Sequence, residues 1–161
     1  MRRFAFATVL LLTAVGLATV ALGQQAVEFG ADLTGAQEVP PVTTNAAGAV
    51  KVTANTERTE LAFELEVRNG TRMLAAAGAH FHCAPQSQNG PVIIFLAGEL
   101  SGGLNGRFEA KGTLTQANIT NTACGATLAE VVQAMQQGRV YANVHSTANP
   151  GGEIRGQLRA R

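Results

Sequence analysis

The sequence contains no tryptophan, one tyrosine, two cysteines and three histidines in 161 residues. Charge is also sparse: Asp, Glu, Lys and Arg make up 14% of the chain and form no basic patch and no run of one sign. A protein that binds nucleic acid or a lipid surface by electrostatics needs such a patch. The composition therefore gives no indication of a nucleic-acid partner or of attachment to lipid.

The catalytic motifs of common hydrolases are missing as well. The chain has no Gly-x-Ser-x-Gly, no Gly-rich phosphate loop and no His-Glu-x-x-His. These absences argue against an ordinary hydrolase, and we expect a protein that is not an enzyme.

The longest uncharged run lies at the N-terminus. Two arginines precede Phe4–Leu22, and small residues stand at the −3 and −1 positions of a cleavage site before Gln24. This pattern predicts a signal peptide over residues 1–23. The mature chain, 24–161, would then be secreted or periplasmic and free of the membrane. The alternative is an uncleaved anchor, because the 19 uncharged residues are just enough to span a bilayer.

After this segment, apolar and polar residues alternate in short stretches. The clearest stretch has Leu61, Phe63, Leu65 and Val67 on one face and polar or small residues on the other. Further strands are predicted at Val27–Thr34, Leu74–Cys83, Val92–Ala97, Gly106–Thr115, Arg139–His145 and Gly152–Ala160. Short strands separated by Gly, Asn and Pro turns predict an all-β fold, an antiparallel β-sandwich of the Ig-like or superoxide-dismutase-like Greek-key type.

One segment has helical rather than strand periodicity. Thr127 and Glu130 have the spacing of a capping box, and Gly138 follows as a stop signal. Apolar residues recur between them with the period of one helix face. We expect one short α-helix near residues 127–137.

The two cysteines, Cys83 and Cys124, predict a disulfide bond, since an even pair in an exported protein most simply forms one. The alternative is a pair of thiolate ligands that bind a metal together with histidines.

Four segments resemble a known family. They are Leu33–Val42 followed by Ala47-Gly48, Ala79–Cys83, Asn89–Val92 and Tyr141–Leu158. In order and spacing they resemble the CHRD (chordin) domain family, in its single-domain exported bacterial form, from about Glu28 to Leu158. The resemblance implies an extracytoplasmic β-sandwich. We expect this domain to act as a binding or interaction module. Its partner would be an extracellular protein or a small ligand that the sequence does not name.

All three histidines lie in the matching segments. His80 and His82 are two residues apart on a predicted strand, so their side chains leave the same face. His145 ends another predicted strand. If the two strands are neighbours, three imidazoles converge, which suits copper or zinc and leaves one coordination position open. The alternative is structural, with the histidines hydrogen-bonded to loop carbonyls.

Three further residues are expected beside this site. Asn143 shares the strand face of His145, and Glu153 shares a face with Arg155 on the last strand. Glu153 or a water would complete the metal site. For Glu153 and Arg155, which share a strand face, we favour a structural role in a cross-strand ion pair over a catalytic role.

The histidine pattern also bears on the class of protein. His-x-His with a distant third histidine is similar in pattern to the copper ligands of Cu/Zn superoxide dismutase. The bridging histidine and the zinc-loop ligands of that enzyme have no counterpart here. A metal-binding interaction module is therefore our main expectation. The alternatives are a copper-dependent redox enzyme and a purely structural extracellular domain.

Overall fold

The computed structural model describes residues 25–161 except 75–77, 97–98 and 103–104. The predicted signal peptide lies outside the described residues. Among the described residues there are ten strands and one α-helix, α1 (Leu128–Gln136). The strands are β1 (Val27–Thr34), β2 (Ala47–Ala54), β3 (Glu60–Gly70), β4 (Ala79–Cys83), β5 (Val92–Phe95), β6 (Glu99–Gly102), β7 (Gly106–Thr115), β8 (Val140–Val144), β9 (Ile154–Gln157) and β10 (Arg159–Ala160).

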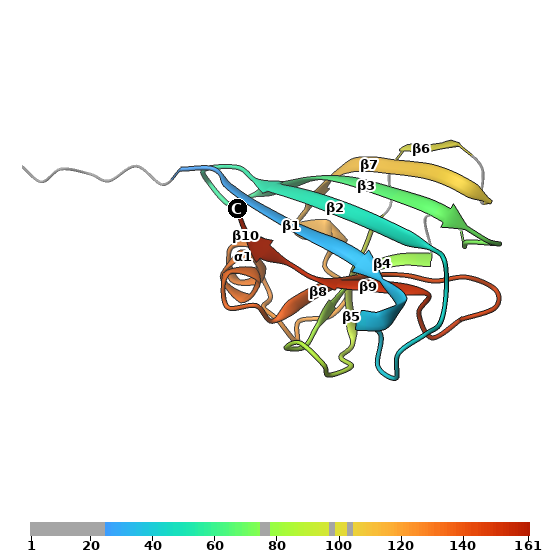
Figure 1. The fold of residues 1–161 in the computed structure, drawn as a ribbon. Coiled ribbons are helices and arrows are strands. Elements are labelled where there is room, and N and C mark those ends of the chain that lie inside the picture. Colours follow the sequence, from blue (N-terminus) through green and yellow to red (C-terminus); the bar gives the residue numbers. More distant parts are fainter. Residues whose placement is uncertain (1–24, 75–77, 97–98, 103–104) are drawn as a thin grey trace, which may run out of the picture.

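The strands form one antiparallel sheet that curls over on itself. Their order is β5-β4-β8-β9-β1-β2-β3-β7-β6, and β10 pairs with β1 outside this path. Figure 1 shows β1, β2, β3, β7 and β6 as an upper layer, with β4, β5, β8 and β9 below it. The layers are joined where Thr34 of β1 pairs with Arg155 of β9. The predicted sandwich-like, all-β fold is confirmed.

The hydrophobic core lies between the layers. On β3 the predicted apolar face, from Leu61 to Val67, is at most 2% exposed at every second residue. Phe81 of β4 and Val144 of β8 reach the same core from below. The alternate residues of β4 and β8 leave the opposite face of the lower layer, yet they are buried too. Loops must therefore cover the outer face of these two strands.

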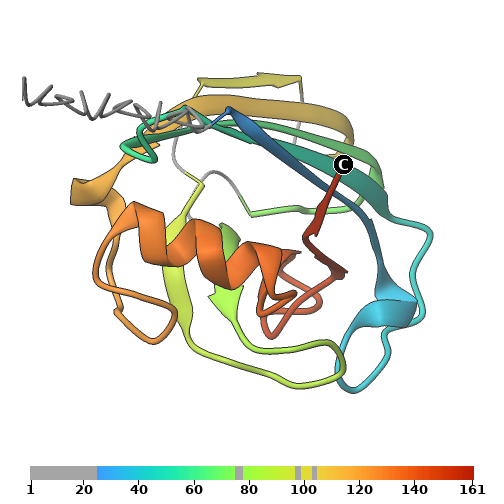
Figure 2. The ribbon, with the colours of Figure 1, turned by 90° about the vertical axis from the view of Figure 1, so that its left-hand side faces the viewer.

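The helix and the disulfide close the lower layer. Thr127 and Glu130 form the predicted capping box: Thr127 Oγ1 accepts from the Glu130 amide at 3.2 Å, and Glu130 Oε2 accepts from the Thr127 amide at 2.9 Å. Figure 2 shows α1 lying across one end of the molecule, beneath the upper layer. Cys83 is bonded to Cys124, with 5.5 Å between their α-carbons. The disulfide prediction is confirmed, and the thiolate alternative is wrong.

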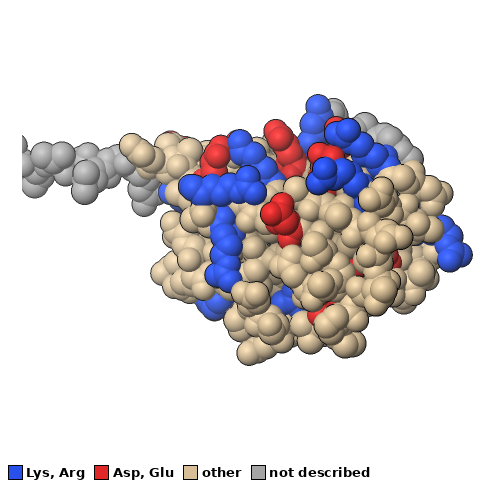
Figure 3. All heavy atoms as spheres, viewed as in Figure 1, with Lys and Arg blue, Asp and Glu red and all other residues tan. Residues whose placement is uncertain are grey.

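Charged side chains of both signs gather over the upper layer on the face drawn in Figure 3. Two ion pairs lie on the strands of this layer: Lys51 is 2.9 Å from Glu28, and Arg107 is 2.7 Å from Glu109. Among the described residues, no helix has the length and apolar character needed to cross a membrane. The face of Figure 3 carries few charges over the lower layer.

Candidate metal-binding site

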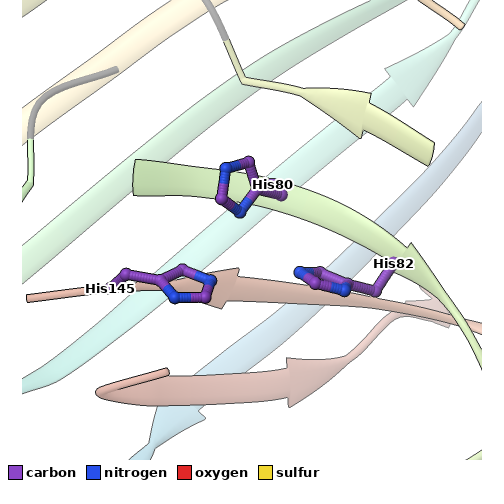
Figure 4. Close-up of side chains that lie close together, drawn as sticks. All are labelled: His80, His82 and His145. Atoms are coloured by element: carbon purple, nitrogen blue, oxygen red, sulfur yellow. The ribbon is translucent and has the colours of Figure 1, made fainter. Parts of the chain in front are cut away.

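The three histidines converge on the outer face of the lower layer. His80 and His82 project from β4, and β4 pairs directly with β8, which His145 follows. Figure 4 shows their rings gathered above these two strands. The ring centroids of His80 and His145 are 4.9 Å apart, and those of His80 and His82 are 5.6 Å apart. One nitrogen from each ring lies within 4.8 Å of the other two.

Loops cover this cluster and hold two of its rings. Each histidine is only 8% exposed. Nδ1 of His82 lies 3.0 Å from the Gly90 carbonyl oxygen, and Nδ1 of His145 lies 2.9 Å from that of Pro150. A carbonyl oxygen only accepts, so Nδ1 carries the proton in both rings. Each neutral ring is then left with a lone pair on Nε2, the atom free to bind an ion.

The sequence leaves two roles open for the histidines, metal binding and hydrogen bonding to loop carbonyls, and the geometry is compatible with both. His82 and His145 do bond loop carbonyls, as the structural alternative requires, but each uses Nδ1 for this purpose. Both Nε2 atoms are buried and have no hydrogen-bond partner among the described residues. Metal-binding histidines commonly show this division, with one nitrogen anchored and the other on the ion.

Burial keeps His82 neutral. Together with smaller effects of positive charge on His80, His145 and Arg155, it lowers the pKa of His82 to about 4, against the opposing effect of the Gly90 carbonyl. Only a neutral imidazole has a lone pair for a metal ion. His82 is therefore ready to bind metal even in mildly acidic solution.

Arg155 lies beside the cluster but does not pair with Glu153. It is 2% exposed, and its guanidinium carbon lies 3.5 Å from the centre of the Tyr141 ring. Its NH groups donate to Gln88 O at 2.7 Å and to Asn89 Oδ1 at 3.1 Å. Among the ion pairs of the described residues, none joins Arg155 to Glu153. The prediction of a cross-strand ion pair is wrong, because the Arg155 guanidinium donates to acceptors in the loop and packs on the Tyr141 ring instead.

Glu153 is used within the turn that connects β8 to β9. Its carboxylate accepts from Ser146 Oγ at 2.7 Å and from the side chains of Asn149 and Thr44. Burial raises the pKa of Glu153, but these hydrogen bonds outweigh it and hold the pKa below its ordinary value. Both oxygens are thus occupied by neighbours. Glu153 fastens the turn behind His145 rather than offering a free ligand atom.

Asn143 and Glu38 form a second buried pair next to the histidines. Asn143 is 3% exposed, Glu38 is 5% exposed, and Asn143 Nδ2 donates to Glu38 Oε2 at 3.4 Å. Burial raises the pKa of Glu38 to about 7, against the opposing effects of the Arg155 charge and the Asn143 hydrogen bond. Asn143 lies where the sequence predicts it. Glu38 comes from the Leu33–Val42 segment, whose two consecutive prolines favour a bend between strands over a ligand-binding role, so the sequence does not place it beside the histidines.

The chain was compared with known protein families, curated proteins and solved structures. Residues 29–158 match the family model of the CHRD domain, a range that contains all three histidines and both cysteines. No curated protein and no solved structure matches the chain. The match confirms the family resemblance but adds no known chemistry to the site.

Proposed function

We propose that this chain, which belongs to the CHRD domain family, is an exported, non-enzymatic domain that binds one copper or zinc ion through His80, His82 and His145. The observation that carries the proposal is the approach of three ring nitrogens to within 4.8 Å of one another. Two of the three rings are anchored through Nδ1, so their free nitrogens are held in place before any ion arrives.

The spacing of the nitrogens fits an ion after a small contraction. Bonds of about 2.0–2.1 Å in a tetrahedral or trigonal site hold nitrogens about 3.3–3.6 Å apart. The observed separations reach 4.8 Å at most. Each nitrogen would therefore move inward by less than about 1 Å, which small ring rotations can supply.

The ligand type favours copper or zinc over harder ions. The donors are all imidazoles, since Cys83 is held in the disulfide and the Glu153 oxygens are bonded within their turn. Magnesium, calcium and manganese prefer oxygen ligands, whereas imidazole suits zinc and copper. The lowered pKa of His82 also favours metal binding, because the ring is neutral at neutral pH and loses no proton when an ion binds.

Two alternatives have less support. A redox enzyme that acts on a sizeable substrate needs an open approach to its metal, but each histidine is 8% exposed and the Phe95 ring lies 4.6 Å from the His80 ring. A docking module needs an apolar patch. Among the described residues the exposed large hydrophobic side chains are only Leu74 and Phe95, and two such side chains do not make a large apolar patch.

Export is supported by two independent features. The N-terminal pattern predicts a cleaved signal peptide. The Cys83–Cys124 disulfide agrees with it, because such bonds persist in oxidising compartments outside the cytoplasm. A secreted or periplasmic domain would also meet its metal outside the cytoplasm.

Calorimetric titration of the purified, chelator-treated protein with Cu(II) and Zn(II) tests the proposal. The wild type is expected to bind one ion per chain, and the His80→Ala/His145→Ala variant to lose this binding. Glu66→Ala/Glu109→Ala is a control that removes two partly exposed carboxylates on the upper layer, away from the cluster, and should bind like the wild type. Uptake by the wild type no greater than that of the double-histidine variant would refute the proposal.

A further inference from the structure

Asn143 lies on the floor of the three-histidine cluster. It is on β8, two residues before His145, and stands directly opposite His80 in the pairing of β4 with β8. Residues two apart on a strand share a face, and so do residues directly opposite on neighbouring strands. The Asn143 side chain therefore leaves the sheet on the same side as the rings in Figure 4.

The two polar atoms of this amide have different surroundings. Nδ2 donates to Glu38 Oε2 at 3.4 Å. Oδ1 is buried and has no hydrogen-bond partner among the described residues. Burying an amide oxygen without a donor is unfavourable, and native proteins leave few such atoms. A donor that arrives with the metal ion would satisfy it.

The orientation of the amide is set by Glu38 and Gly152. At Gly152, which has a φ of 140°, an added Cβ would lie 2.8 Å from Asn143 Nδ2 and 2.6 Å from Glu38 Oε1. The backbone thus approaches both side chains as closely as a glycine allows. With Glu38 ionised, turning the amide over would place Oδ1 against a carboxylate oxygen of Glu38, and two acceptors repel. Oδ1 is therefore the atom directed away from Glu38.

We infer that an ion at His80, His82 and His145 keeps a water molecule in its fourth coordination position, and that Asn143 Oδ1 accepts a hydrogen bond from that water. This inference rests on the proposed metal site. Three protein ligands with a water in the fourth position is a common arrangement for zinc, and water on a cation is a strong donor. The same oxygen would disfavour ligands that have no proton to donate, such as azide.

Pulsed electron paramagnetic resonance of the Cu(II)-loaded protein in D₂O detects water on the ion through exchangeable deuterons. Azide affinity, followed by the charge-transfer absorption of the copper, reports the preference for protic ligands. The wild type is expected to show strong deuteron coupling and weak azide binding. Asn143→Leu and Asn143→Ala should bind azide about tenfold more tightly, because the repelling acceptor is gone. Asn45→Leu, at an exposed asparagine, should match the wild type.

The outcomes separate the two proposals. Copper uptake without deuteron coupling in the wild type would overturn the inference and leave the metal site standing, as would direct ligation by Asn143 Oδ1. Equal azide affinities in the wild type and in a folded Asn143 variant would also overturn the inference and leave the metal site standing. If the wild type takes up no copper, both proposals fall. The deuteron measurement needs no variant, so a substitution that prevents folding does not block the test.

Discussion

The ring of Tyr141 lies almost flat against the ring of His82, with centroids 4.8 Å apart and planes 10° from parallel. Arg155 approaches the same tyrosine, its guanidinium carbon 3.5 Å from the ring centre. Because β8 lies between β4 and β9, the tyrosine separates the cation from the imidazole. The stack fixes the plane of His82 and keeps a positive charge near it, which contributes to its low pKa.

Replacing Tyr141 separates the contribution of its ring from that of its hydroxyl. Tyr141→Phe keeps the stack and loses only the acceptor for the Gly90 amide at 3.3 Å, so metal affinity should stay within about threefold. Tyr141→Leu removes the stack and should weaken metal binding by about tenfold or more, as expected when the support of a ligand is lost. Calorimetric titration measures both. Equal affinities in the two variants would show that the ring does not position His82.

Gly152 and Gly151 offer a matched pair for the turn beside the site. An added Cβ at Gly152 would lie 2.6 and 2.7 Å from the two Glu38 carboxylate oxygens, at a φ that side chains rarely adopt. At Gly151 it would meet nothing within 4 Å. Gly152→Ala should therefore lower the free energy of unfolding by about 2 kcal/mol or more, and Gly151→Ala by less than about 0.5 kcal/mol. Urea unfolding provides both values, and equal losses would contradict this account.

Strands with one face in the core and the other in water are the ones that the sequence predicts best. β1 and β7 occupy the predicted ranges, Val27–Thr34 and Gly106–Thr115, because alternation over a long stretch leaves one register possible. Of the strand predicted over Leu74–Cys83, residues 75–77 lie outside the described residues, and β4 covers Ala79–Cys83. β4 is buried on both faces, so no alternation marks its start. The short, Gly-containing strand β6 was not predicted at all.

The site was predictable only as far as local geometry extends. The shared face of His80 and His82 follows from the period of a strand. Their meeting with His145 depends on the pairing of β4 with β8, which are far apart in the sequence, and no local pattern encodes that pairing. The sequence predicts an ion pair for Arg155 because it shares a strand face with Glu153, but the partners of Arg155 come from a distant loop and a neighbouring strand.

The disulfide should support the fold and leave the metal site intact. Cys83 and Cys124 are 41 residues apart, and closing a loop of that length stabilises the folded state by about 4 kcal/mol on the chain-entropy model. Cys83→Ala/Cys124→Ala should therefore unfold at much lower urea concentration. While folded, it should bind metal with an affinity near that of the wild type, since neither sulfur is a ligand. Loss of metal binding by the folded variant would contradict this assignment.

Export should produce a chain that begins at Gln24. Signal peptidases need small residues at the −3 and −1 positions, which Ala21 and Gly23 supply. Mass spectrometry of the exported protein should give the mass of residues 24–161. Gly23→Phe should block the cut, whereas Ala26→Phe, outside the two critical positions, should leave it in place. Recovery of the full-length chain in the membrane fraction of wild-type cells would support the anchor instead.

The stability of the metal-free protein should vary little between pH 4.5 and 6.5, because two buried groups oppose each other there. His82 has an ordinary pKa of 6.5 and a folded pKa of about 4. In this pH window His82 is protonated in the unfolded chain but not in the folded chain, so it makes the free energy of unfolding rise with pH. Glu38 has an ordinary pKa of 4.5 and a folded pKa of about 7. The folded chain keeps a proton that the unfolded chain releases, so this group makes stability fall as pH rises.

Substitution of either group should reveal the slope of the other. Glu38→Gln should leave a protein whose free energy of unfolding increases by about 2–3 kcal/mol from pH 4.5 to 6.5, given about 1.4 kcal/mol for each unit of pKa shift. His82→Gln should show a decrease of similar size. Urea unfolding with a chelator present, at several pH values in this window, measures both slopes. A flat profile for Glu38→Gln would mean that burial does not lower the pKa of His82. A flat profile for His82→Gln would mean that the carboxyl of Glu38 is not protonated in the folded protein, and that its burial beside Asn143 is offset by the charge of Arg155.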